Sequence, residues 1–239
     1  FSKESYHIQR FINTDFEQKL KDVLRKEEFD VVQLETLYLA PYISTIRKYS
    51  DAIIAMRSHN VEHEIWERIT ANTRFLPKRM YLAHLTKKLK RYEIEVQNQY
   101  DLLIPISRRD EQKFKSFGFK GTSKVTPIGV DSDQYRPDYD SYQKDLSISF
   151  IGSLDWMPNQ EGLKWFLDKV WARLSQRNPN LSLHIAGRNT PKWISQIKRK
   201  NVKVYGEVPC AHKFINEHSI MVVPLLSGSG MRAKILEGM

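Results

Sequence analysis

Short apolar runs alternate with amphipathic segments along almost the whole chain, and this alternation restricts the fold more than any other feature. Strand-like runs occur at residues 30–34, 52–56, 101–106, 147–151, 181–186, 202–205 and 220–226. Segments whose apolar residues recur at helical spacing separate these runs. Strands that alternate with helices form parallel sheets joined by right-handed crossovers. The sequence therefore predicts the α/β class.

The helical segments carry recognisable start signals. Helices are expected at residues 15–28 and 39–49, from 61, around 82–96, at 160–176 and at 211–217. Asn60 is a good N-cap for the helix that begins at Val61, and Ser107–Asp110 has the form of a capping box. Pro191 is expected at the first position of a further helix.

A polar stretch interrupts the alternation at residues 129–145, where apolar residues are sparse. We interpret it as a linker between two doubly wound, Rossmann-like domains, which we place at residues 1–135 and 136–239. The chain begins at Phe1 instead of Met and stops at Met239, inside a predicted helix barely two turns long. We therefore expect a piece of a longer protein, incomplete at both ends.

Polar and glycine residues follow several of the predicted strands directly. Gly152, Gly187–Arg188 and Ser227–Gly230 do so in the second domain, and Ser58–His59 does so in the first. Parallel sheets bind ligands beyond the carboxyl ends of their strands, so we expect one rim of each domain to face a common cleft. His59 suits hydrogen bonding or general-base catalysis at a sugar hydroxyl, and equally a helix cap or surface residue. Arg188 suits a diphosphate, and equally a surface turn.

The carboxy-terminal segment has the pattern of an anion site. Ser227–Gly230 forms a loop of small residues before a helix, where backbone N–H groups and the helix dipole favour phosphate. Lys234 and Glu237 share a helical face with Gly230, at i+4 and i+7. The cation suits a diphosphate and the carboxylate suits sugar hydroxyls, which together predict a nucleotide-sugar site.

The composition limits the kinds of partner that the protein is expected to bind and the compartment in which it is expected to work. The 239 residues carry a net charge of +10, much of it in Lys87–Arg91 and Lys198–Lys200, which both fall on predicted helices. These clusters fit either a solvated helix face or attachment to an anionic membrane surface. The single Cys210 excludes an internal disulfide and a cysteine-rich zinc site, and no apolar run approaches the length that spans a membrane. We therefore expect a cytoplasmic protein, peripheral on the inner face of the membrane.

Three further predictions concern side-chain burial and metal binding. Periodicity places Glu93 on a solvated helix face, and it places Trp165, Phe166 and Trp171 in the core. No His/Cys cluster and no trusted carboxylate pair occurs, so no metal site and no cofactor are predicted.

Taken together, several segments resemble the retaining glycosyltransferases of the large GT4 group, which have the two-domain GT-B fold. In the first domain the resemblance rests on Arg57–Glu62, Tyr92–Glu93 and Ser107–Asp110. In the second it rests on Phe150–Ser153, Pro158–Gly162, Ile185–Gly187 and Gly228–Met239, of which the last is the most specific.

The resemblance implies metal-independent transfer of a sugar from a nucleotide diphosphate, with retained configuration, to a glycan or lipid-linked acceptor. It implies catalytic roles for His59 and Lys234, and ribose binding by Glu237. The residues that it implies for the donor diphosphate are Gly152, Arg188, Ser229, Gly230 and Lys234. The first glutamate of the family's paired-glutamate motif is replaced here by Ser229.

Two other functions remain open on the sequence. A non-hydrolysing nucleotide-sugar epimerase would share the fold and bind the same kind of donor. A basic nucleic-acid-binding protein would explain the charge of +10, but the lysines are dispersed over several helices and no recognised nucleic-acid module occurs. We therefore expect a nucleotide sugar, not nucleic acid, as the partner.

Overall fold

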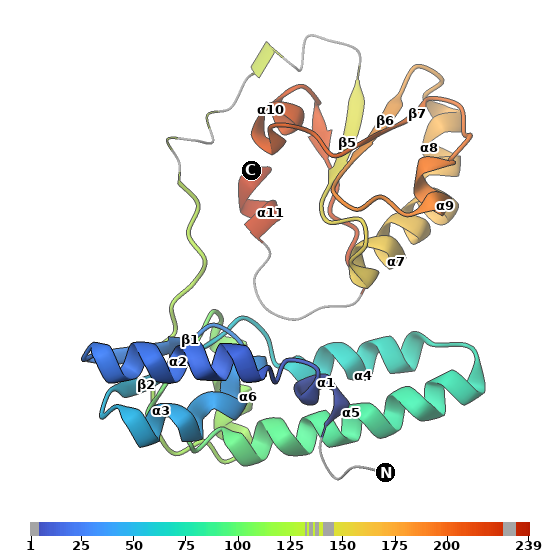
Figure 1. The fold of residues 1–239 in the computed structure, drawn as a ribbon. Coiled ribbons are helices and arrows are strands. Elements are labelled where there is room, and N and C mark those ends of the chain that lie inside the picture. The colour runs from blue at the N-terminus through green and yellow to red at the C-terminus, as the bar shows by residue number, and fades with distance from the viewer. Residues whose placement is uncertain (1–4, 132, 134–135, 137–138, 141–145, 227–232) are drawn as a thin grey trace. The chain divides into compact units, whose positions relative to one another are not determined.

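The chain folds into two compact units in a computed structural model. The structure describes residues 5–131, 133, 136, 139–140, 146–226 and 233–239. The first unit runs through Ile128 and the second begins at Gly129 (Figure 1). Each unit is an α/β layer structure around its own parallel sheet, as the alternating sequence pattern predicts.

The first unit contains a parallel sheet with the strand order β1-β2-β3-β4. Its strands are β1 (Val31–Leu34), β2 (Ile53–Ser58), β3 (Leu102–Pro105) and β4 (Thr122–Ser123). Its helices are α1 (Tyr6–Gln9), α2 (Thr14–Lys26), the 3₁₀ helix η1 (Leu37–Tyr42), α3 (Ile43–Tyr49), α4 (Glu62–Asn72), α5 (Leu76–Val96) and α6 (Arg108–Ser116). The two-residue β4 is an element that the sequence did not predict.

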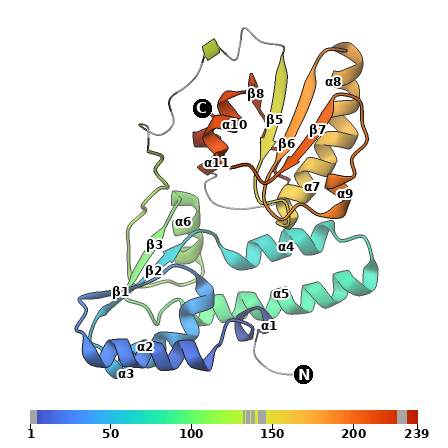
Figure 2. The ribbon, with the colours of Figure 1, turned by 45° about the horizontal axis from the view of Figure 1, so that its top comes forward.

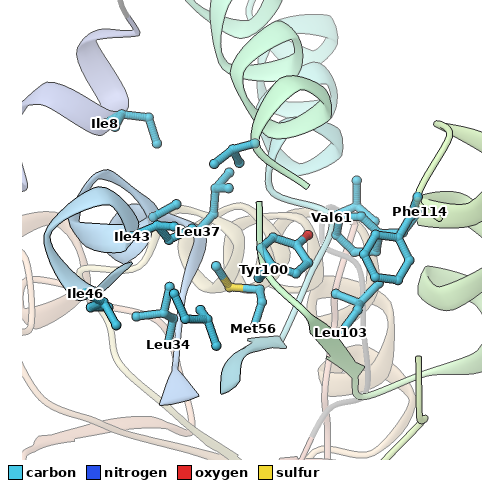
Figure 3. Packing of buried hydrophobic residues seen from close by; sticks show 14 of the residues in the cluster. Ile8, Leu34, Leu37, Ile43, Ile46, Met56, Val61, Tyr100, Leu103 and Phe114 are labelled. Atoms are coloured by element: carbon cyan, nitrogen blue, oxygen red, sulfur yellow. The ribbon is translucent and has the colours of Figure 1, made fainter. Parts of the chain in front are cut away.

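The core of this unit forms where the helices cover the sheet. Leu34, Met56 and Leu103 come from three adjacent strands and are almost fully buried. Figure 3 shows them beneath helix residues that include Ile43. Burial of such side chains contributes roughly 1.5–3 kcal/mol each, so this cluster fixes which helix face meets the sheet.

Helices α4 and α5 form a hairpin that extends from the first unit (Figure 2). Ile65 and Ile69 of α4 pack against Leu82 of α5. The predicted apolar face of α5 is confirmed, because Leu82, Leu85 and Leu89 are buried.

The second unit contains a parallel sheet with the strand order β7-β6-β5-β8. Its strands are β5 (Ser147–Ile151), β6 (Ser182–Ala186), β7 (Val202–Gly206) and β8 (Ile220–Met221). Its helices are α7 (Met157–Trp165), the π-helix η3 (Phe166–Trp171), α8 (Ala172–Arg177), α9 (Lys192–Ser195), α10 (Ala211–Asn216) and α11 (Ala233–Glu237). Both views place α7 and α8 on the side of the sheet away from α10 and α11 (Figure 1, Figure 2).

A glycine brings α7 against the segment after β8. A Cβ atom on Gly162 would lie 1.5 Å from the carbonyl oxygen of Pro224, so only glycine permits this contact. The core above the sheet is built from Phe150, Leu163, Leu183 and Trp171, all nearly inaccessible to solvent.

Several element predictions for the second unit were wrong in detail. The strand expected at 220–226 is only Ile220–Met221. The N–H of Val222 still donates to the carbonyl of Ser149 at 2.8 Å, but Pro224 has no N–H with which to extend the strand. Pro191 is the N-cap of α9 and not its first residue. The Lys198–Lys200 cluster lies after this four-residue helix and not on it. Arg199 of that cluster pairs with Asp168 at 2.7 Å, so a long-range ion pair holds this turn.

Two burial predictions were also wrong. Trp165 is 42% exposed, although Phe166 and Trp171 are buried as predicted. The chain changes from α- to π-helix at Phe166, which alters the face that each residue presents. Glu93 is buried and not solvated, with only 2% of its surface exposed.

In the described part of the chain, no helix is long and apolar enough to cross a membrane.

Candidate functional site

The carboxyl edge of the second sheet brings two glycines into close contact. Strand register pairs Ile151 with Ala186, so Gly152 and Gly187 leave adjacent strands side by side. The N–H of Gly152 donates to the carbonyl of Ala186 at 3.2 Å. A Cβ on Gly187 would lie 1.7 Å from the carbonyl oxygen of Gly152, and its φ of +154° also favours glycine. Glycine is therefore required at both strand ends, because the two backbones pack against each other and the Lys234 side chain fills the space beside Gly152.

Lys234 extends from α11 to this edge. Its Nζ lies 2.8 Å from the position that a Cβ of Gly152 would occupy, and 5.3 Å from the centre of the Phe150 ring. The ammonium also donates to Oδ1 of Asn159 at 3.1 Å. The structure thus brings two of the predicted residues, Gly152 and Lys234, together beyond β5.

Asn159 orients this lysine. Its Nδ2 donates to the carbonyl of Ser153 at 2.8 Å, which turns Oδ1 toward the Lys234 ammonium. The side chain is buried, with 6% of its surface exposed. The sequence analysis included Asn159 only within the Pro158–Gly162 segment and did not assign it to the site, because its partner lies 75 residues away.

Arg188 follows β6 on the same edge and is exposed. Its carbonyl accepts from the N–H of Leu154 at 2.9 Å, which ties it to the loop after β5. The hydrogen bond from the Ser153 hydroxyl lowers the pKa of Asp155, and the Arg188 charge adds to this effect. Asp155 is therefore ionised at neutral pH, and the positive charge of Arg188 favours this state.

Of the remaining predicted site residues in this domain, the structure describes one and not the other two. Ser229 and Gly230 lie outside the described residues. Glu237 is half-buried in α11, one turn after Lys234. The predicted common helical face of Lys234 and Glu237 therefore falls on α11, while the loop before it stays a prediction.

His59 belongs to the first unit, where it directly follows β2 as predicted. Its Nε2 lies 3.1 Å from Oε2 of Glu35, and both side chains are exposed. The hydrogen bond with His59 is the main cause that lowers the pKa of Glu35. Glu35, which the sequence did not single out, therefore orients the imidazole by an ionised carboxylate.

A small cavity of about 120 Å³ lies beside His59. Tyr38 and Glu62 line it, and the Tyr38 hydroxyl donates to Oε2 of Glu62 at 2.9 Å. Burial, and then the negative charge of Glu93, raises the pKa of Glu62 to about 7. This carboxyl therefore gains and loses its proton near neutral pH.

Glu93 holds the start of α4, which follows the loop that carries His59. Its two carboxylate oxygens accept from the N–H groups of Glu62 and His63 at 2.9 and 3.1 Å. It also pairs with Nδ1 of His63 at 2.6 Å, and both side chains are buried. A carboxylate from α5 thus caps α4, so the prediction that Asn60 caps this helix was wrong.

Comparison with known proteins agrees with this architecture. Residues 145–239 match the family model described as "Glycosyl transferases group 1". The chain is 24% identical over 234 residues to an "Uncharacterized 44.6 kDa protein in cps region" of Klebsiella pneumoniae. That match covers 92% of this chain and 58% of the relative, so the chain spans little more than half of the relative's length.

Two solved structures have a similar fold at low sequence identity. A sucrose-phosphate synthase from Thermosynechococcus elongatus aligns with a TM-score of 0.68 and 14% identity, over 93% of this chain and 57% of that one. A structure titled "Trehalose-6-phosphate from E. coli bound with UDP-2-fluoro glucose" aligns with a TM-score of 0.58 and 14% identity, over 91% and 58% of the two chains.

These matches agree with the resemblance that the sequence motifs predicted. The similarity in fold and the sequence match to the Klebsiella protein extend through both units, whereas the family model matches the second unit. The chain is thus similar to the group 1 glycosyltransferases, and it has the GT-B type of α/β fold over part of its neighbours' length.

Proposed function

We propose that the full protein is a glycosyltransferase that moves a sugar from a nucleotide diphosphate to a glycan or lipid-linked acceptor. The observation that carries this proposal is the Lys234 ammonium, held by Asn159 beside Gly152 at the carboxyl edge of the second sheet. A diphosphate leaving group develops negative charge as the bond to the sugar breaks. A preorganised cation stabilises that charge.

The proposed donor is a nucleotide sugar. The UDP-2-fluoro glucose named for one structural neighbour supports this class of ligand. Arg188 lies on the same edge, and we assign it to the outer phosphate as a second cation. We assign Glu237 to the ribose hydroxyls, because it stands on the helix that delivers Lys234.

The finer chemistry is part of the same proposal. We propose transfer with retained configuration and without a metal ion, in keeping with the GT4-like motifs. The positive charges of Lys234 and Arg188 would do what a divalent cation does at the diphosphate in other transferases. His59, oriented by Glu35, is assigned to a hydroxyl of the transferred sugar. We place the reaction in the cytoplasm, at the inner face of a membrane that holds the acceptor.

The test is Lys234→Ala in the full-length protein, assayed for release of nucleotide diphosphate from a panel of nucleotide sugars. Turnover is expected to fall by about a hundredfold or more, because one preorganised charge is lost at the leaving group. Lys200→Ala is the matched control, since Lys200 is an exposed lysine of the same unit at a turn away from this edge. Circular dichroism and thermal melting report whether both variants fold.

Unchanged turnover in folded Lys234→Ala would remove the diphosphate assignment. A product that is still a nucleotide sugar but has an altered sugar would support the epimerase instead. Activity that is lost in a chelator and restored by a divalent cation would contradict metal independence.

A further inference from the structure

The tip of the α4–α5 hairpin exposes a group of large apolar side chains. Four lie within residues 75–81, with exposed fractions of 68% for Phe75, 63% for Leu76, 66% for Met80 and 59% for Tyr81. Single exposed apolar residues are common on protein surfaces, but such a concentration usually marks a contact site. We call these four residues the hairpin patch.

The geometry of α5 keeps the hairpin patch away from the core of its own unit. Leu82, Leu85 and Leu89 turn one face of the helix inward, where they are buried. Leu76 and Met80, one turn apart, lie on a different face and remain exposed. The helix therefore has one apolar face that packs in its own unit and a second, shorter one that does not.

Positive charge surrounds the patch. The sequence contains no aspartate or glutamate between Glu67 and Glu93. Within that interval, Arg74, Lys78 and Arg79 are exposed, and among the described residues no carboxylate pairs with them. Farther along α5 the pattern changes, because Lys90 pairs with Glu67 and Arg91 with Glu95. Unpaired cations thus gather where the apolar side chains are exposed.

We propose that the hairpin patch docks the protein on an anionic lipid bilayer. Phe75, Leu76, Met80 and Tyr81 would enter the boundary between headgroups and acyl chains, while the neighbouring basic side chains meet the anionic headgroups. A short helix segment with this combination of bulky apolar and basic residues binds membrane surfaces without crossing them.

The same charges make other partners less suitable. Two copies of this chain meeting through the patch would bring like charges together. Single-stranded nucleic acid needs aromatic platforms for its bases, and two of the four patch residues are aliphatic. This inference specifies the membrane attachment that is part of the proposed function. It rests on residues of the first unit alone, so it can fail or succeed independently of the donor site around Lys234.

The first experiment is sedimentation of the full-length protein with vesicles, in the absence of any nucleotide sugar. Vesicles of phosphatidylcholine containing phosphatidylglycerol are compared with vesicles of phosphatidylcholine alone. We expect binding to the anionic vesicles, weakened by salt. Phe75→Ser combined with Leu76→Ser should lower the affinity about tenfold or more, because the inserted apolar surface is lost.

Matched controls separate the patch from general surface properties. Tyr139→Ser removes an aromatic side chain that is 70% exposed, close to the 68% of Phe75, and should leave binding unchanged. Lys78→Gln with Arg79→Gln should weaken binding roughly fivefold for each charge. Lys19→Gln with Lys26→Gln, on α2, removes the same charge from another exposed surface and should have a smaller effect.

A positional readout completes the test. Tryptophan placed by Phe75→Trp should be quenched by brominated lipid in anionic vesicles, whereas Tyr139→Trp should not. Equal vesicle binding by the serine double variant and the parent would overturn the proposal. Sedimentation velocity that shows a dimer in the parent and a monomer in the serine variant would overturn it too, by assigning the patch to a second copy.

Discussion

The candidate donor site depends on individual residues, above all on two glycines at positions where a Cβ atom would collide with neighbouring atoms. The Lys234 ammonium would meet a Cβ at Gly152, and a Cβ at Gly187 would meet the Gly152 carbonyl. Each glycine therefore removes an obstacle at one strand end. Because the two backbone segments lie so close together here, even one added methyl group should lower the free energy of unfolding.

Gly187→Ala tests this close approach. The added Cβ would lie 1.7 Å from the Gly152 carbonyl oxygen and the φ is +154°, so the strands must separate. We expect the free energy of unfolding to fall by about 3 kcal/mol, measured by urea denaturation. Gly129→Ala is the control, since a Cβ there meets no atom within 4 Å. Equal effects of the two substitutions would contradict the packing argument.

At the element scale, α4 is held by a carboxylate from another helix. Glu93 accepts from the N–H groups of Glu62 and His63 and pairs with the buried His63 ring. The first turn of α4 and the loop before it are thereby fixed relative to α5. His59 lies in the loop that leads into this turn, three residues before Glu62, and it pairs with Glu35.

Glu93→Gln should therefore loosen the start of α4. The amide can accept from one N–H group, but it presents a donor to the other and leaves His63 without its carboxylate. We expect the free energy of unfolding to fall by about 3 kcal/mol. Hydrogen exchange should increase at residues 62–64. Glu95→Gln breaks only an exposed pair with Arg91 and should change stability by less than about 1 kcal/mol.

Loss of the Glu93 charge should also change the titration of Glu62. Because that charge is one cause of the raised pKa of Glu62, Glu93→Gln should lower the pKa of Glu62 from about 7. Carbon-detected NMR of the Glu62 carboxyl measures this shift. A pKa that stays near 7 would mean that burial alone raises it.

At the scale of the whole molecule, one titratable group in each of the two units should give stability an opposite dependence on pH. Glu62 has a folded pKa raised to about 7, so its contribution to stability is full below its unfolded value of 4.5 and is lost as pH rises toward 7. His184 has a folded pKa lowered to about 4, mainly by burial and then by His218. Its contribution is full above 6.5 and is lost as pH falls toward 4.

Paired variants measure these opposite slopes. Glu62→Gln should flatten the decline in stability between pH 4.5 and 7, by about 2 kcal/mol relative to the parent. His184→Gln should flatten the decline between pH 6.5 and 4 by a similar amount, about 2 kcal/mol. Denaturation is followed by NMR signals assigned to each unit. A Glu62→Gln effect that appears in the second unit's signals would contradict separate cores.

Much of the fold could be predicted from local patterns. Three predictions depended only on residues that are close in sequence, and each is confirmed. They are the alternation of strands and helices, the N-cap at Ser107 and the buried face of α5. The short β8 and the exposed Trp165 were missed, because strand length and helix type depend on what the chain packs against. The predicted roles of His59, Arg188 and Lys234 stay predictions, since their chemistry needs a substrate.

Local sequence patterns are sufficient to specify the parallel α/β layers and the glycines at the strand ends, since hydrophobic periodicity and turn preferences act over a few residues. Which polar groups come into contact depends on the packing of distant segments. Lys234 reaches Asn159 across 75 positions, and Glu93 reaches His63 across 30. Such pairings follow from how the helices and strands pack. Burial strengthens hydrogen bonds and shifts pKa values, and it arises only when distant segments exclude water together.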